Sequence, residues 1–197
     1  MKLKFLTSLL AAGVMLVGSS AFALTDAQKA AINTAINAAT TATVADAAAT
    51  ALRNNCPNGE DDCLQFIIGA AKLKLGANAS IASVRGLVNA LVLAAPTRAG
   101  AIVSAAGAPN AFPGMKANIA AAAQEGLLTA AAKPAGTPGA ITAAQANTLS
   151  GEVNFAAGIG VATTGTSGGT LFTANLAIAK AAAEFQRSNQ NNYSQPN

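Results

Sequence analysis

Residues 25–53, TDAQKAAINTAINAATTATVADAAATALR, carry the signal that decides the fold. Thr25 and Gln28 match a capping box, in which the threonine hydroxyl accepts from the backbone N–H three residues on and the glutamine reaches back. Alanine, which has the highest helix propensity, dominates the residues after this box. The stretch predicts a long helix from Ala27 to Arg53. We expect it to bend or divide at residues 40–43, because β-branched threonines lose rotamer freedom in a helix.

Helix signals continue through the rest of the chain. Residues 64–75 and 81–95 are amphipathic, and Ser80 is placed to cap the second of them. Thr142 and Gln145 repeat the opening capping box, and a last helix is predicted over 171–187. Clusters of β-branched and aromatic residues with period-two alternation are nearly missing. The sequence therefore predicts an all-α fold, an alanine-rich bundle or irregular array of six to eight short helices. The apolar residues expected to mark its last two helices include Leu149, Val153, Phe155, Leu171, Phe172, Leu176, Ile178 and Phe185.

Two proline-led segments share one pattern. Residues 96–106 and 113–123 each begin with proline, have isoleucine six positions later, and end in an alanine pair. Proline suits the first position of a helix because its missing N–H would have no partner there. The pattern indicates a helical unit used twice, with chance similarity between alanine-rich segments as the alternative.

Residues 1–23 have the three parts of a signal peptide. A short positive start is followed by an apolar run over 5–17, and Ala21 and Ala23 form an A-x-A cleavage site that leaves Leu24 as the first residue. An N-terminal membrane anchor is the alternative, but a span needs about 20 apolar residues. We therefore expect a bacterial protein that is exported to the periplasm or the extracellular space.

After cleavage we expect one helical domain over residues 24–187, with 133–139 as the place for a hinge. The polar residues 188–197 predict a disordered tail. No membrane span is expected in the processed chain, since its most apolar stretch, 86–108, is interrupted by a proline and an arginine. Removing two leader lysines lowers the formal net charge from +4 to about +2.

Cys56 and Cys63 are the only cysteines and bracket an acidic turn. In an oxidising compartment such a pair is expected to form a structural disulfide, since a redox-active pair usually has two residues between the cysteines and this one has six. Closing so short a loop would stabilise the fold by roughly 2–3 kcal/mol. The pair predicts a covalent staple between the end of one helix and the start of the next.

The acidic turn is the one candidate metal site. Asn58, Glu60, Asp61 and Asp62 supply oxygen ligands of the kind that hard cations prefer, although their spacing does not match a calcium-binding loop. The alternative is a solvated turn in which Asp61 or Asp62 caps the following helix and favours its positive end. This second interpretation is preferred, so no metal or other cofactor is expected.

The composition argues against catalysis and against nucleic-acid binding. The chain has no histidine, which excludes serine–histidine and cysteine–histidine nucleophile pairs and the commonest zinc sites. Lysines and arginines are scattered singly, so no basic stripe exists. The glycine-rich residues 158–160 and 165–169 lack a complete dinucleotide or phosphate-loop motif. The remaining acids are isolated from one another: Asp26, Asp46, Glu125, Glu152 and Glu184.

The sequence thus predicts a non-enzymatic structural or protein-interaction role in the cell envelope or on the cell surface. More than a quarter of the processed chain is alanine, so large core side chains are few and burial against another copy or a protein partner is expected. The alternative is a periplasmic module that binds a small apolar ligand or a divalent ion, with the acidic turn or residues 158–170 at its mouth.

Residues 34–50 also resemble, in composition only, the alanine- and threonine-rich helices of type I antifreeze proteins. The regular threonine spacing of that family is not kept here. The resemblance covers a single helix, and it implies ice binding as a further alternative that thermal hysteresis would test.

Overall fold

The protein is built from α-helices. The computed structural model describes residues 24–56, 60–162 and 170–193, with backbone only for 190–193. Across these residues the chain forms eight α-helices, two short 3₁₀ turns and no strand, which confirms the predicted all-α class. The elements are α1 Asp26–Ala38, α2 Val44–Asn55, α3 Asp61–Leu75, α4 Ile81–Ala94, η1 Pro96–Arg98, α5 Ala99–Ala106, η2 Pro113–Met115, α6 Lys116–Ala131, α7 Ala143–Ala157 and α8 Leu171–Tyr193.

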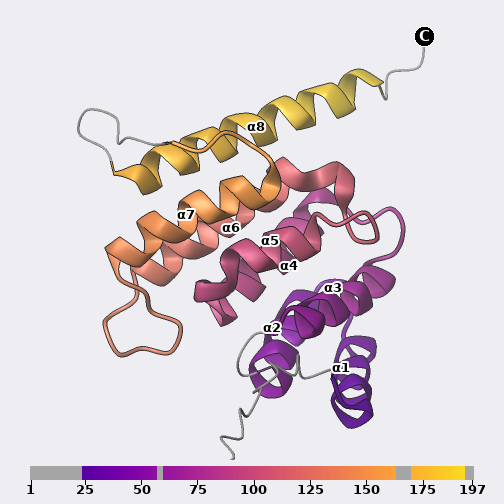
Figure 1. Ribbon diagram of the computed structural model, residues 1–197. Helices are drawn as coiled ribbons and strands as arrows, with labels where there is room; N and C mark the ends of the chain where they lie inside the picture. The colour runs from indigo at the N-terminus through magenta and orange to yellow at the C-terminus, as the bar shows by residue number, and fades with distance from the viewer. Residues whose placement is uncertain (1–23, 57–59, 163–169, 194–197) are drawn as a thin grey trace, which may run out of the picture.

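The helices are arranged around α6. Helices α4, α5, α7 and α8 all contact α6, while α2 joins α4 to the group formed by α1, α2 and α3. In Figure 1 the α1–α3 group lies at one end of the molecule and α8 lies across the other end, beyond α6 and α7. The two ends of the described chain are therefore far apart.

The predicted division of the first helix is confirmed. Helix α1 ends at Ala38 and α2 begins at Val44. Between them the Thr43 hydroxyl accepts from the backbone N–H of Thr40 at 2.9 Å, and the two threonine hydroxyls lie 3.1 Å apart. These side chains take over hydrogen bonds that a continuous helix would have made.

Local signals at the other helix starts are confirmed as well. Both predicted capping boxes, at Thr25 and Thr142, are present, and Ser80 accepts from the backbone N–H of Ser83 at 3.1 Å. Pro96 and Pro113 each open a 3₁₀ turn that continues directly into a helix, α5 and α6 respectively. The two proline-led segments therefore share one local structure.

The last helix is longer than predicted. Helix α8 continues to Tyr193, so residues 188–193 are helical where a disordered tail was expected from Ser188 onward. Once a helix is formed, each added residue gains one backbone hydrogen bond, and asparagine or glutamine costs only a fraction of a kcal/mol relative to alanine. Residues 194–197 of the expected tail lie outside the described residues.

The size of the fully buried side chains falls toward the end of the chain. The twelve largest fully buried side chains of the described residues all come from α1 to α6, and none from α7 or α8. Residues 120–123, four consecutive alanines of α6, are completely buried, and 11 of its 16 residues are buried overall. Residues 117–124 of α6 are thus buried on all sides, and their mostly small side chains let the neighbouring helices approach closely.

Helices α6 and α4 approach each other closely at Gly126. A Cβ atom added to Gly126 would lie 2.9 Å from Val92 Cγ1 and 3.3 Å from the Asn89 carbonyl oxygen. The glycine therefore sets the separation of the two helices.

The connection between α6 and α7, residues 133–139, lies against the end of α4. Lys133 Nζ donates to the Pro138 carbonyl at 3.2 Å. Gly139 has a positive φ of 74°, and an added Cβ would lie 2.8 Å from the Leu93 carbonyl oxygen. The hinge expected here stays a prediction.

No single described helix has the length and apolarity needed to cross a membrane. The pair formed by α4 and residues 96–106 passes that test together, but the two halves are bent by 119° at the break.

Candidate functional site

The cysteine pair joins α2 to α3. Cys56 directly follows α2, Cys63 lies in the first turns of α3, and both are buried. Their Cα atoms are 6.1 Å apart, within the range of natural disulfides, and the two are paired with each other. The Cα separation of the two cysteines therefore fits the predicted staple. The turn residues 57–59 lie outside the described residues, and with them the candidate ligand Asn58.

The described acidic residues of this turn act on α3. Asp61 and Asp62 lie in its first turn, where a negative charge favours the positive end of the helix. Glu60, not an aspartate, occupies the N-cap position and makes no capping hydrogen bond through its side chain. Within the described ranges, no group of three or more histidine, cysteine, aspartate or glutamate side chains could hold a metal ion.

Asp61 has a specific partner on another element. Its carboxylate pairs with the guanidinium of Arg98, at the end of η1. The Asp61 side chain is 71% exposed and that of Arg98 is 36% exposed. The pair connects the acidic turn to a cleft that Arg98 lines.

This arginine cleft, as we call it, has a volume of about 460 Å³. It lies where the ends of α2 and α4, the η1 turn and the segment before α7 meet, and it includes Cys56. Its apolar floor is formed by residues such as Leu52, Pro96 and Ile141, all buried. The polar residues of its described lining are Arg53, Thr97, Arg98 and Gln145, with no acidic residue among them.

A second polar feature is internal. Gln124 of α6, Ser150 and Asn154 of α7, and Asn175 of α8 are each at most 1% exposed, and we call them the amide cluster. Gln124 Nε2 donates to Asn154 Oδ1 at 2.9 Å and to the Ser150 carbonyl at 2.8 Å. Asn175 Nδ2 donates to Ser150 Oγ at 3.1 Å. The cluster thus joins three helices.

The amide cluster also fixes the start of the loop after α7. Asn154 Nδ2 donates to the Gly160 carbonyl at 3.1 Å, and the Ala162 N–H donates to Asn175 Oδ1 at 2.8 Å. Neutral amides are neither acids nor bases at physiological pH, so this arrangement positions backbone and does not transfer protons. Among the described atoms Gln124 Oε1 has no hydrogen-bond partner.

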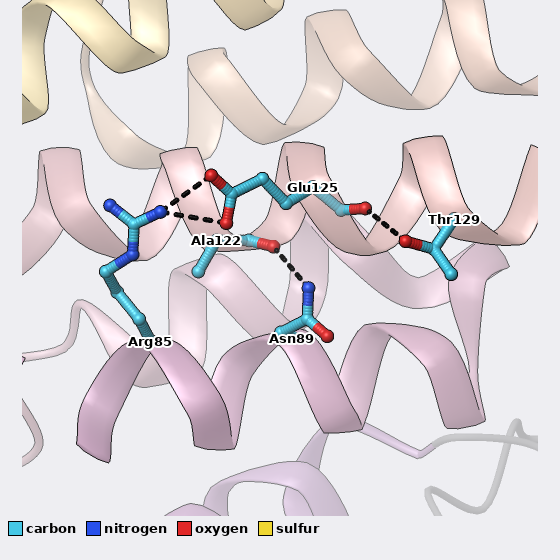
Figure 2. A network of polar contacts seen from close by, with 5 residues as sticks. All are labelled: Arg85, Asn89, Ala122, Glu125 and Thr129. Atoms are coloured by element: carbon cyan, nitrogen blue, oxygen red, sulfur yellow. Dashed lines mark hydrogen bonds and ion pairs between the residues drawn. The ribbon is translucent and has the colours of Figure 1, made fainter. Parts of the chain in front are cut away.

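Helices α4 and α6 carry a third set of polar contacts beside the Gly126 contact. Figure 2 shows Arg85 reaching from α4 to both carboxylate oxygens of Glu125 on α6, at 2.7 and 2.8 Å. One turn along α4, Asn89 Nδ2 donates to the Ala122 carbonyl at 3.4 Å. Thr129 Oγ1 bonds the Glu125 carbonyl at 3.0 Å. These contacts hold α4 and α6 together.

The fourth candidate is an apolar groove between α5 and α7, about 450 Å³ in volume, which we call the α5–α7 groove. Phe155 lines it with 80% of its surface exposed. Phe185 on α8 is also largely exposed, at 70%. Apart from Phe155 the groove is lined by Gly100, Ala101, Ser104, Gly151, Glu152 and Ala156.

Helical spacing explains why Phe155 is exposed. In α7 the buried face is formed by Leu149, Val153 and Ala157 together with Ser150 and Asn154, and Phe155 lies off that face. Sequence reasoning missed the amide cluster, although a signal exists: Asn147, Ser150 and Asn154 recur at steps of three and four, which places polar groups on one helix face.

Comparison with protein-family models, with curated proteins and with solved structures found no match to this chain.

Proposed function

We propose that this protein is an exported, non-catalytic helical protein with a structural or protein-interaction role in the bacterial cell envelope or on the cell surface. We further propose that copies of the chain associate through the α5–α7 groove. The observation that carries this proposal is Phe155, a large aromatic side chain that is 80% exposed beside a groove of small residues.

The patch is complementary to itself. A two-fold symmetric interface places the same surface of both subunits in contact, so it needs a protruding group and a recess within one patch. Phe155 supplies the protruding group, while Gly100, Ala101 and Ala156 leave room between α5 and α7. Buried aromatic side chains fitted into small pockets supply much of the free energy at protein interfaces. A second copy can therefore bury Phe155 in the groove of the first.

The groove is also stiff enough to serve as a recess. A Cβ on Gly100 would lie 3.2 Å from Glu152 Cβ, so α5 and α7 are already in close contact at its base. Helix α7 is held from its other side by the amide cluster. Because these helices are already held in place, association would cost little conformational entropy, and a smaller cost gives a higher affinity.

The non-catalytic part of the proposal is supported by the residue types that the chain contains, and it does not depend on the groove. The sequence contains no histidine, and its two cysteines are paired with each other. Export is supported by the leader pattern of residues 1–23, which lies outside the described residues. Fractionation of cells into cytoplasm, periplasm, outer membrane and medium tests it, and retention in the cytoplasm would overturn that part.

Association is tested by light scattering coupled to size exclusion, on the processed chain over a range of concentrations. The wild-type chain is expected to reach the mass of a dimer as concentration rises, while Phe155→Ser stays monomeric. Phe185→Ser is the matched control, because Phe185 is also an exposed aromatic residue and does not line the groove. A wild-type monomer at every concentration, or equal loss in both variants, would overturn the groove as the interface.

A further inference from the structure

We propose that the arginine cleft binds a small carboxylate that carries a short apolar chain. The inference goes beyond self-association and does not rest on it, because the cleft shares no lining residue with the α5–α7 groove.

The charge of the cleft favours an anion. Arg53 and Arg98 both line it, and no aspartate or glutamate is among its described lining residues. Arg53 bonds the Thr50 hydroxyl at 3.2 Å and forms no ion pair with a carboxylate within the described part of the chain. Guanidinium groups bind carboxylates through charge-assisted hydrogen bonds, which are stronger than neutral ones. The two arginines can therefore receive one anionic group from the rim.

The floor of the cleft favours an apolar body behind that group. Leu52 and Ile141 are nearly fully buried, and Pro96, which also lines the cleft, is buried as well. A compact polyanion such as phosphate would turn some of its oxygens toward this apolar floor, where they would lack donors. A carboxylate exposes its two oxygens at one end only, so its chain can cover the floor. A volume of about 460 Å³ lies within the range of small-molecule sites.

Asp61 shows how such a ligand would be held. Its side-chain carboxylate already pairs with the Arg98 guanidinium, although Asp61 itself does not line the cleft. Arginine has five N–H donors, so this contact leaves others unused. Asp61 therefore competes electrostatically with the proposed ligand, and its removal should strengthen binding. A merely structural role of the two arginines does not predict that gain.

Calorimetric titration of the processed, oxidised chain tests the assignment with three probes. Hexanoate has both the charge and the chain, 1-hexanol has the chain alone, and inorganic phosphate has the charge alone. Saturable binding of hexanoate alone, weakened by added salt, is expected. Binding of hexanol as tight as that of hexanoate would overturn the role of the arginines. Binding of phosphate as tight as that of hexanoate would overturn the role of the floor.

Variants locate the site. Arg53→Gln is expected to weaken hexanoate binding about fivefold or more, and Asp61→Asn to tighten it about threefold. Arg187→Gln is the matched control, an exposed arginine on α8 outside the cleft, and should leave binding unchanged. An Arg53→Gln chain that binds as wild type overturns the proposal, as does equal weakening by Arg187→Gln.

A measurement on the unmodified chain keeps the test independent of how the variants fold. In ¹⁵N NMR spectra, hexanoate should shift the backbone amide signals of Thr97 and Ile141, which line the cleft, with the same saturation curve as the calorimetry. Shifts confined to residues far from the cleft would overturn the assignment.

Discussion

The side-chain amide of Asn154 donates to the backbone carbonyl of Asn175 at 3.0 Å and to its side-chain oxygen at 3.3 Å, which ties α7 to α8. Both residues are almost completely buried. Alanine side chains interlock weakly, so apolar packing alone would leave the register of these helices poorly defined. Directional hydrogen bonds in a low-dielectric interior supply the missing specificity. These hydrogen bonds between α6, α7 and α8 fix the helix register that large buried side chains fix elsewhere in the fold.

This role predicts that Asn154→Ala lowers the free energy of unfolding by about 1–3 kcal/mol, since Gln124, Gly160 and Asn175 each lose a buried partner. Urea unfolding followed by circular dichroism measures it. The control is Asn33→Ala, an exposed asparagine in α1, which should be neutral or slightly stabilising. Equal urea midpoints for both variants would show that the amide cluster does not contribute to stability.

The Gly126 contact predicts a steric cost. An added Cβ would meet the stiff, buried side chain of Val92, so Gly126→Ala should destabilise by about 1–2 kcal/mol even though alanine favours helix. Thermal and urea unfolding test this. Gly86→Ala in α4, where the new Cβ meets nothing within 4 Å, is expected to stabilise by about 0.5–1 kcal/mol. Partial recovery in Val92→Ala/Gly126→Ala would locate the clash, and a stabilising Gly126→Ala would contradict it.

The Arg85–Glu125 pair predicts a measurable coupling between α4 and α6. Their side chains are 27% and 37% exposed, so the interaction is partly shielded from water. A double-mutant cycle to alanine should give a coupling energy of about 0.5–1 kcal/mol that falls with salt. The exposed Asp26–Lys29 pair, at 3.8 Å, is the control and should show none. A coupling energy of zero for Arg85 and Glu125 would show that their contact does not stabilise the packing of α4 on α6.

The cysteine pair predicts a loss of stability on its removal. The cysteines are seven positions apart, so the loop is short and Cys56→Ala/Cys63→Ala should cost roughly 2–3 kcal/mol through a freer unfolded chain. Urea unfolding with and without reductant measures it. Reductant should lower the wild-type midpoint and leave that of the double variant unchanged. A wild-type midpoint insensitive to a reductant that demonstrably reduces the cysteines would contradict the prediction.

The elements that sequence predicted correctly all depend on neighbours along the chain. The capping boxes at Thr25 and Thr142, the break at Thr40–Thr43 and the proline-led starts involve contacts within four residues. The predicted end of the last helix at residue 187 was wrong. The prediction treated the polar residues that follow as a helix terminator, although such residues only weaken a helix that is already formed. A starting signal is chemically specific, whereas the polar residues 188–193 contain no terminating glycine or proline.

The candidate sites depend on contacts that sequence spacing does not contain. Arg53 and Arg98 come together only because α2, α4 and η1 meet at one corner, and Gln124 reaches Asn154 across thirty positions of sequence. Composition and local signals by themselves determined that the chain is helical, where most helices begin, and that it has no histidine to offer. The tertiary structure alone decided which polar groups are buried, that Phe155 is left outside, and that two arginines share a cleft. The reason is physical: helix formation is a short-range equilibrium, while burial depends on which faces the packed neighbours cover.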